Sequence, residues 1–138
     1  MITKLGASDE TTIRFFMSAA PCGRAPHMTE DEGTDLNFTA YWVPNPRDSY
    51  SVIATGDSME DARIFAGDML VIDAGRETID GNIIVAWLNG ELTVKRLQHD
   101  AEGRVMLVAE NRKYAPMTIT EHDDFRVLGI VTSVHRKL

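Results

Sequence analysis

A serine and a lysine carry the strongest chemical signal in this sequence of 138 residues. Ser58 follows Gly56 and Asp57 directly after a short apolar run, so a sharp turn would leave its hydroxyl beside free backbone N–H groups. The N–H groups of Asp57 and Ser58 are the candidate donors to an oxyanion. Gly-Asp-Ser is also an ordinary turn sequence, so this motif alone does not establish a nucleophile.

Lys95 lies in the second motif, a strand-like run over residues 92–97. Alternation along a strand places Lys95 and Arg96 on opposite faces, so one of them must face inward unless the strand lies at an edge. Burial without a carboxylate partner can lower a lysine pKa by ~3–5 units, and the neutral amine can then act as a general base beside a serine hydroxyl. The alternative is an edge-strand lysine that extends its amine into solvent.

Other catalytic and metal-binding patterns are weak or absent. Four histidines are widely spaced and have no Cys pair nearby, so we expect no zinc site at His27, His99, His122 or His135. The sequence has neither a glycine-rich phosphate loop nor a dinucleotide-binding fingerprint. A Ser–His–Asp triad needs no fixed spacing, and no residue here favours one. We therefore expect neither a metal nor an organic cofactor.

Short strands separated by turns must position these residues. Two apolar runs, 83–88 and 92–97, flank Asn89-Gly90, a dipeptide favoured in two-residue type I′ hairpins. Further strands are predicted at 52–54, 69–72, 105–109 and 125–134. The predicted fold is mainly β: a compact, antiparallel β-rich domain with an extended N-terminal arm.

The N-terminal part differs from the rest of the chain. Four of the five prolines lie before residue 50. A short helix is predicted over residues 8–20, with Ser8 as its N-cap and apolar side chains at helical spacing, namely Ile13, Phe16, Met17 and Ala20. We expect residues 1–44 to form an arm without a core of its own and residues 45–138 to form the β domain. A disordered leader is the alternative for the arm.

Length and composition are those of one globular domain, with 43% hydrophobic and 25% charged residues. A net charge of −7 argues against direct binding to a nucleic-acid backbone. The longest apolar run, 83–88, is too short to span a bilayer, and no signal-peptide pattern is present. The single cysteine excludes an internal disulfide. We therefore expect a cytoplasmic protein that is not bound to a membrane.

Four motifs in order resemble one known family. They are Gly56-Asp57-Ser58-Met59 and the runs 67–73, 81–86 and 92–97. The arrangement resembles the self-cleaving serine–lysine peptidases of the LexA/UmuD group, peptidase family S24, in which the nucleophile and the lysine are usually 37 residues apart, as Ser58 and Lys95 are. Segments 110–111, 114–116 and 127–131 also fit, so the resemblance covers roughly 49–138. It implies a LexA/signal-peptidase-like β fold with Ser58 as nucleophile and Lys95 as general base.

The N-terminal part resembles the UmuD branch of this group. LexA-type repressors carry a DNA-binding helix-turn-helix domain before the peptidase, and the first 50 residues show no such pattern. The UmuD branch instead has a Cys-Gly scissile bond about 36 residues before the serine, and Cys22-Gly23 precedes Ser58 by 36 residues. The resemblance implies cleavage between Cys22 and Gly23, although the dipeptide is also a simple turn. Residues 24–50 match poorly, and residues 60–63 replace a glycine-containing loop.

The resemblance also implies a role in the SOS response to DNA damage. A cytoplasmic homodimer would cleave its own arms when stimulated by a RecA filament on single-stranded DNA. The shortened product would bind a Y-family, UmuC-like subunit and act in translesion synthesis as part of an error-prone DNA polymerase V. Phe15 and Phe16 resemble a peptide that contacts the sliding clamp, or else they pack the arm onto the body or onto the dimer partner. Two alternatives are a non-catalytic interaction module of the same fold and a processing peptidase that cuts other proteins.

Overall fold

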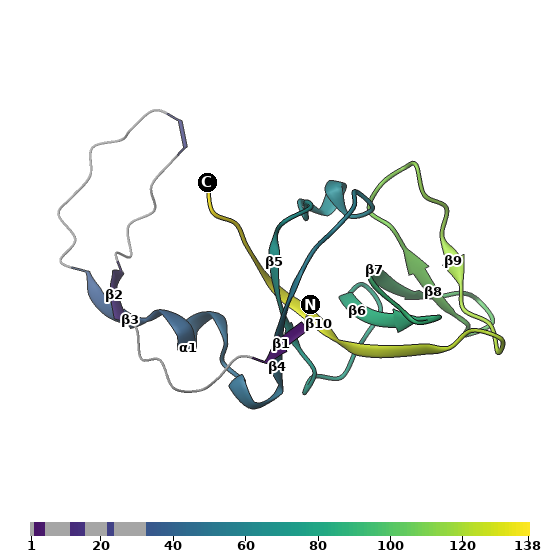
Figure 1. Ribbon diagram of the computed structural model, residues 1–138, viewed down its shortest axis with the longest axis horizontal. Coiled ribbons are helices and arrows are strands. Elements are labelled where there is room, and N and C mark those ends of the chain that lie inside the picture. Colours follow the sequence, from purple (N-terminus) through teal and green to yellow (C-terminus); the bar gives the residue numbers. More distant parts are fainter. Residues whose placement is uncertain (1, 5–11, 16–21, 24–32) are drawn as a thin grey trace. The chain divides into compact units, whose positions relative to one another are not determined.

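The computed structural model describes residues 2–4, 12–15, 22–23 and 33–138 of the chain. It divides the chain into two compact units (Figure 1). The β unit comprises Met1–Gly6 and Asn45–Leu138, and the N-terminal unit comprises Ala7–Pro44.

An eight-stranded antiparallel sheet forms the β unit and confirms the predicted mainly β fold. The strand order is β1-β4-β5-β10-β6-β7-β8-β9. The strands are β1 (Ile2–Lys4), β4 (Ser49–Ile53), β5 (Met69–Asp73), β6 (Ile83–Leu88), β7 (Glu91–His99), β8 (Val105–Val108), β9 (Met117–Thr118) and β10 (Phe125–His135), with 3-10 turns η1 (Pro46–Asp48) and η2 (Glu60–Ala62). Each of the predicted strand segments overlaps one of these strands.

The β6–β7 hairpin turns at Asn89 and Gly90, as predicted. Both residues have positive φ, 51° and 86°, which is the requirement of a type I′ turn. The Asn89 side chain holds the turn in place, because its Oδ1 accepts a 2.9 Å hydrogen bond from the Asp124 N–H. The tight turn determines the register, which places Lys95 opposite Ile84.

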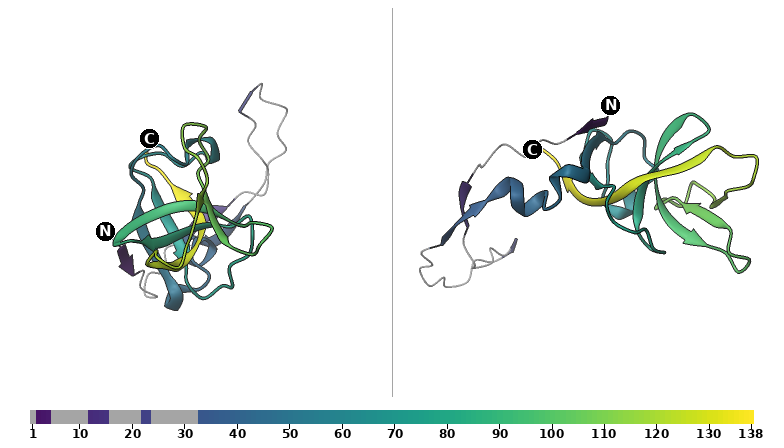
Figure 2. Two further views of the ribbon diagram at one scale, coloured as in Figure 1. Left: turned by 90° about the vertical axis from the view of Figure 1, so that its right-hand side faces the viewer. Right: turned by 90° about the horizontal axis from the view of Figure 1, so that it is seen from below.

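The long strand β10 joins the two halves of the sheet, because it pairs with β5 and also with β6. It is the yellow ribbon that crosses the β unit in Figures 1 and 2. Its register shifts between Val127 and Gly129, where the backbone passes very close to β5. A Cβ on Gly129 would lie 2.8 Å from the Asp73 carbonyl oxygen, so only glycine fits at this bend.

Strand β6 separates two hydrophobic clusters. Val85 packs into a cluster with residues of β4, β5 and the segment after β4, namely Val52, Ala54, Met59, Ile64, Leu70 and Ile72. Ile84 and Ala86 point to the other side, where they pack with Leu97 and Leu107. A strand buried on both faces needs an unbroken apolar run, which explains why residues 83–88 do not alternate with polar residues.

In the N-terminal unit, β2 (Thr12–Phe15) pairs antiparallel with β3 (Thr34–Asn37), and α1 (Phe38–Trp42) follows. The prediction of a helix over residues 8–20 is therefore wrong for Thr12–Phe15. The β-branched Thr12 and Ile13 suit a strand, and the pairing partner about twenty residues away overrides the weak helical spacing. Residues 8–11 and 16–20 of that prediction lie outside the described residues.

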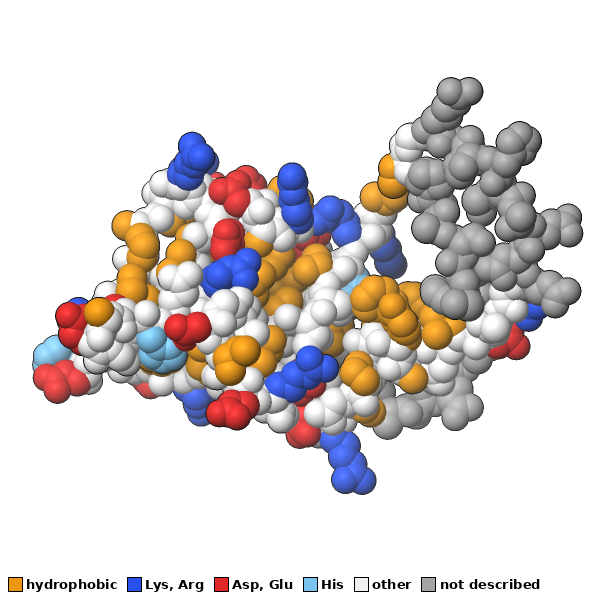
Figure 3. Space-filling model, turned by 180° about the vertical axis from the view of Figure 1, so that it is seen from behind, with side chains coloured by type: hydrophobic (Ala, Val, Ile, Leu, Met, Phe, Trp, Pro, Cys, Tyr) orange, Lys and Arg blue, Asp and Glu red, His pale blue; other side chains and the backbone are white. Residues whose placement is uncertain are grey.

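The described surface of the β unit mixes charges of both signs. On the face shown in Figure 3, Lys and Arg side chains of the described residues lie among Asp and Glu side chains. Within the described ranges, no helix has the length and apolar character needed to cross a bilayer.

Candidate active site

The loop that carries Ser58 begins where β4 ends. Backbone hydrogen bonds of 2.8 Å join Ala54 to Asp68 and Gly67, which holds the start of the loop against the segment before β5. Gly56 then takes a φ of 75°, a left-handed conformation that glycine adopts without strain. Met59 is buried at the far end of the loop. The half-buried Ser58 is thus held between two anchored ends.

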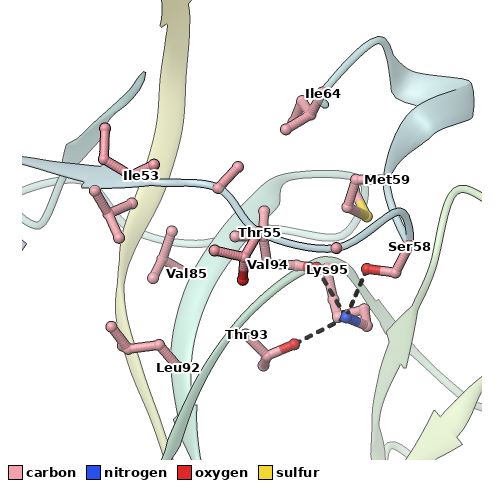
Figure 4. Close-up of a pocket in the computed structure, with 13 residues that line it drawn as sticks. Ile53, Thr55, Ser58, Met59, Ile64, Val85, Leu92, Thr93, Val94 and Lys95 are labelled. Atoms are coloured by element: carbon pink, nitrogen blue, oxygen red, sulfur yellow. Dashed lines mark hydrogen bonds between the residues drawn. The ribbon is translucent and has the colours of Figure 1, made fainter. Parts of the chain in front are cut away.

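Lys95 extends from β7 to this serine (Figure 4). Its Nζ lies 3.1 Å from Ser58 Oγ, 2.9 Å from Thr93 Oγ1 and 3.1 Å from the Val94 carbonyl oxygen. Thr93 and Lys95 are two residues apart on one strand, so their side chains share a face. The structure therefore brings together the serine and the lysine that the sequence singled out, 37 residues apart.

The surroundings of Lys95 favour its neutral form. Burial lowers the pKa of Lys95 from its ordinary value of 10.5. Among the described residues, no carboxylate contacts the amine to oppose this shift. A neutral amine has two N–H donors and one lone pair. These suit the three neighbours, because Thr93 Oγ1 and the Val94 carbonyl can accept while the Ser58 hydroxyl donates to Nζ.

Arg96 takes the opposite side of β7 and does not enter the cleft. Its guanidinium forms an ion pair with the Glu110 carboxylate and donates a 2.6 Å hydrogen bond to the Gly81 carbonyl. The two basic neighbours therefore divide as strand alternation requires. The arginine keeps an anionic partner, and Lys95 faces the serine.

Of the predicted oxyanion donors, the Ser58 backbone N–H has no acceptor among the described residues, whereas the Asp57 N–H acts on the carboxylate of its own side chain. The carbonyl of Asp57 is occupied, because it accepts a 2.8 Å hydrogen bond from Asn111 Nδ2. The loop is thus held by the Asp57 carbonyl, and the Ser58 N–H stays available to a substrate.

A cleft of about 320 Å³ opens beside the two side chains. Its apolar lining includes Val52, Ala54, Ile64, Val85 and Leu92, which Figure 4 shows around the serine and the lysine in part. A cleft that mixes polar and apolar groups, with Ser58 and Lys95 at one end, suits the polar backbone and the small or apolar side chains of an extended peptide. The chemistry available at that end is acyl transfer by a serine hydroxyl with an amine as base.

No role in the site is predicted from the sequence for Thr93, Asn111 or Tyr114, although Asn111 and Tyr114 lie in segments that fit the family. Thr93 contacts the amine of Lys95. Strand alternation could have indicated this contact, because residues two apart on a strand point to the same face. Residues Asn111 and Tyr114 contact the residue before the serine. Nothing local in the sequence indicates that contact, because more than fifty residues separate the partners.

The other predicted positions belong to other parts of the chain. Cys22 is exposed in the N-terminal unit, and no described atom lies within 4 Å of the position that a Cβ on Gly23 would occupy. Phe15 belongs to β2, and Phe16 and His27 lie outside the described residues. The remaining histidines do not line the cleft. His99 contacts Asp80, His122 contacts Glu121, and His135 contacts Ser133.

Comparison with known proteins identifies similar chains. Residues 15–132 match the Peptidase S24-like family. The chain is 29% identical over 128 residues to Protein SamA of Salmonella typhimurium strain LT2, covering 93% of this chain and 88% of SamA. It is 33% identical over 128 residues to Protein MucA of Salmonella typhimurium, covering 92% of this chain and 86% of MucA.

Similarity extends to repressors with longer chains. The LexA repressor of Bordetella pertussis strain Tohama I is 34% identical over 119 residues, covering 86% of this chain and 52% of the repressor. The chain thus spans about half the length of that repressor and most of the length of SamA and MucA.

Proposed function

This chain belongs to the Peptidase S24-like family, and from that membership we propose that it is a UmuD-type serine peptidase that cleaves itself between Cys22 and Gly23. The observation that supports the proposal most strongly is the 3.1 Å contact between Ser58 Oγ and Lys95 Nζ. Similarity to SamA and MucA over most of their lengths supports a chain of UmuD-type organisation.

The reaction begins with a proton transfer from Ser58 to Lys95. The neutral amine accepts the hydroxyl proton as Oγ attacks the carbonyl carbon of Cys22. The carbonyl oxygen becomes an oxyanion, and the N–H groups of Asp57 and Ser58 donate hydrogen bonds to it. Thr93 and the Val94 carbonyl accept from the lysine and hold Nζ toward the serine throughout.

The second half of the reaction releases the two products. The Cys22–Gly23 C–N bond breaks, and the Lys95 ammonium gives its proton to the new amine of Gly23. An ester between Cys22 and Ser58 remains. Water attacks this ester with Lys95 again as base, which frees Ser58 and leaves fragments 1–22 and 23–138.

The segment between the Cys22–Gly23 bond and Ser58 is long enough for an intramolecular reaction. Fully extended, the 27 residues from Cys22 to Ser49 would span roughly 90 Å, several times the ~14 Å radius of gyration of a compact chain of this length, and this is an upper limit because β3 and α1 lie within the stretch. Cleavage within one chain and cleavage across a homodimer are both compatible with this reach. Ser58→Ala chains mixed with natural chains separate the two cases: they should be cut if cleavage occurs between chains and should stay intact if each chain cuts only itself.

The partners follow from the same family membership. We propose that a RecA filament on single-stranded DNA stimulates the cleavage and that the product, as a homodimer, binds a UmuC-like Y-family polymerase subunit in the cytoplasm. Phe15 and Phe16 are the proposed contact with the sliding clamp. That contact is wrong if Phe15→Ala together with Phe16→Ala leaves clamp binding unchanged in a pull-down.

Self-cleavage of the purified protein at alkaline pH tests the activity. Intact mass should show fragments 1–22 and 23–138 for the natural chain. Ser58→Ala and Lys95→Ala should stay intact because they lack the nucleophile and the base. Lys95→Arg should also stay intact, because a guanidinium remains protonated and cannot accept a proton. Lys137→Ala, which removes an exposed lysine, is the matched control and should cleave normally.

Other outcomes would identify the alternatives. Efficient cleavage by Ser58→Ala would mean that another residue is the nucleophile. An intact natural chain, with or without the filament, would favour a non-catalytic interaction module of the same fold. Cleavage of an added protein without self-cleavage would indicate a processing peptidase.

A further inference from the structure

The loop after β8, residues 110–114, contacts the residue that precedes the nucleophile, and we call it the bracing loop. Asn111 Nδ2 donates a 2.8 Å hydrogen bond to the carbonyl of Asp57. The Tyr114 hydroxyl donates to one carboxylate oxygen of Asp57, and Lys113 Nζ lies 3.1 Å from the other. The bracing loop therefore holds Asp57 by both its backbone and its side chain.

The same loop also contacts the strand that carries the lysine. The carboxylate of Glu110 forms an ion pair with Arg96, the residue directly after Lys95. The Glu110 carbonyl accepts a 2.8 Å hydrogen bond from the Asp61 N–H in η2, just after the serine. One loop thus joins the segments on either side of the 3.1 Å contact between Ser58 and Lys95.

The serine loop needs such a support. It begins at Gly56, which has a φ of 75° and open space around its Cα, so neighbouring side chains do not restrict it there. Within the described part of the chain, side-chain hydrogen bonds reach residues 55–58 only from Lys95 and the bracing loop. Without the bracing loop, the contact with Lys95 would be the one side-chain hydrogen bond left to residues 55–58 among the described residues, and the loop would otherwise be held only at its two ends.

We propose that Tyr114 and Asn111 are positioning residues for the dyad, which fix Asp57 and thereby hold the Ser58 hydroxyl and the adjacent N–H groups in reacting geometry. This proposal rests on the proposed self-cleavage. Neither side chain lines the cleft, so both act through Asp57 and do not contact the scissile bond. Of the two side-chain contacts to the carboxylate, the tyrosine is the directional one. The lysine is an exposed ion pair that water and salt screen.

The charges at the contact suit this role. The hydrogen bond from Tyr114 and then that from Lys113 lower the pKa of Asp57, so it is a carboxylate at neutral pH. The same hydrogen bond raises the pKa of Tyr114, which keeps its proton. A neutral phenol therefore donates to an anion, a stronger contact than one between neutral groups.

Tyr114→Phe, which removes one hydroxyl, tests the proposal. We expect self-cleavage to slow about tenfold to a hundredfold, because small displacements of a reacting group have effects of that size. The midpoint of its pH profile should not move, because Lys95 keeps its surroundings. Tyr41→Phe, at another exposed tyrosine, is the matched control and should change the rate less than about twofold.

A double-mutant cycle tests whether Tyr114 acts on the serine loop through Asp57. If Tyr114 acts through Asp57, Tyr114→Phe should slow cleavage much less in an Asp57→Ala background than in the natural chain. Asp57→Asn retains an acceptor for the hydroxyl and should lose less activity than Asp57→Ala. Equal and additive effects in both backgrounds would overturn the proposal.

Hydrogen exchange separates this proposal from the proposed function. Amides of residues 56–59 should exchange faster in Tyr114→Phe, while those of the β6–β7 hairpin stay unchanged. If the natural chain does not cleave itself, the proposed function fails, and the exchange result still decides whether the bracing loop orders the serine loop. Unchanged exchange at residues 56–59 would show that the loop does not position Ser58.

Discussion

Arg136, close to the C-terminus, holds a buried carboxylate near the start of β5. Its Nε and a terminal nitrogen both lie 2.6 Å from the oxygens of Asp68, which is only 1% exposed. The guanidinium also stacks over the Phe65 ring, with 4.8 Å between its Cζ and the ring centroid. The bidentate pair ties the end of β10 to the segment that carries Ile64, which lines the cleft.

Removing this arginine should destabilise the β unit. Arg136→Ala leaves a buried carboxylate without its cation, so the melting temperature at neutral pH should fall by several degrees. The hydrogen bonds from Arg136 lower the pKa of Asp68 below 3.8, so the pair stabilises fully above that pH and less as pH falls through the lowered pKa. Thermal melts at neutral and acidic pH should therefore show the difference from the natural chain shrinking in acid. Lys137→Ala should melt like the natural chain at both pH values.

Self-cleavage should become faster as the pH rises. Lys95 acts as a base only when neutral, so the rate should rise about tenfold per pH unit below its pKa and level off above it. Because burial lowers the pKa of Lys95, the midpoint should lie below 10.5. Intact mass at timed intervals across neutral and alkaline pH measures the profile. A rate that is constant over this range would contradict Lys95 as the base.

Substitutions at the scissile bond should separate its two residues. Cys22→Ala should cleave at nearly the natural rate, because the sulfur takes no part in the chemistry. Gly23→Val should slow cleavage about tenfold or more by crowding the bond at Ser58. The space around Gly23 is open among the described residues, so the slower rate would not come from a clash within the N-terminal unit. Loss of cleavage in Cys22→Ala alone would contradict the assigned nucleophile.

Gly129→Ala should destabilise the sheet by about 1–3 kcal/mol, because the new methyl group would overlap the backbone of Asp73 on β5. Urea unfolding measures the change. Arg126→Ala, on the same strand but exposed, is the control and should change the free energy of unfolding by less than about 0.5 kcal/mol. Equal stabilities of Gly129→Ala and the natural chain would show that β10 can move away from β5 at this position.

Local patterns predicted much of the fold, and non-local pairing accounts for the rest. Asn89-Gly90 and its flanking apolar runs predicted the hairpin because turn and strands are adjacent in sequence. The pairing of β10 with both β5 and β6 has no local signal. The segment Thr12–Phe15 was misread as helix for the same reason, since its partner β3 begins at Thr34.

Local patterns also predicted part of the candidate site, and contacts with distant segments determine the rest. Strand alternation separated Lys95 from Arg96 on β7, but their neighbours decide which side chain faces the serine. Ser58 contacts one and Glu110 the other, and both come from distant segments. The departure from the family pattern after the serine also has a structural result. Arg63 takes the left-handed φ of 64° at the end of η2, a conformation that glycine adopts more readily.

Strand β1 connects the proposed cleavage to the edge of the sheet. Ile2–Lys4 pair with Tyr50, Ser51 and Val52, so β1 covers the outer edge of β4. In the intact chain, the covalent connection between β1 and β4 keeps this short strand at a high effective concentration beside β4. A cut after Cys22 places β1 in the released peptide, and three paired residues must then bind as a separate molecule. Cleavage would thus uncover the N–H and C=O groups of β4 and create a main-chain template to which a strand of another protein can add.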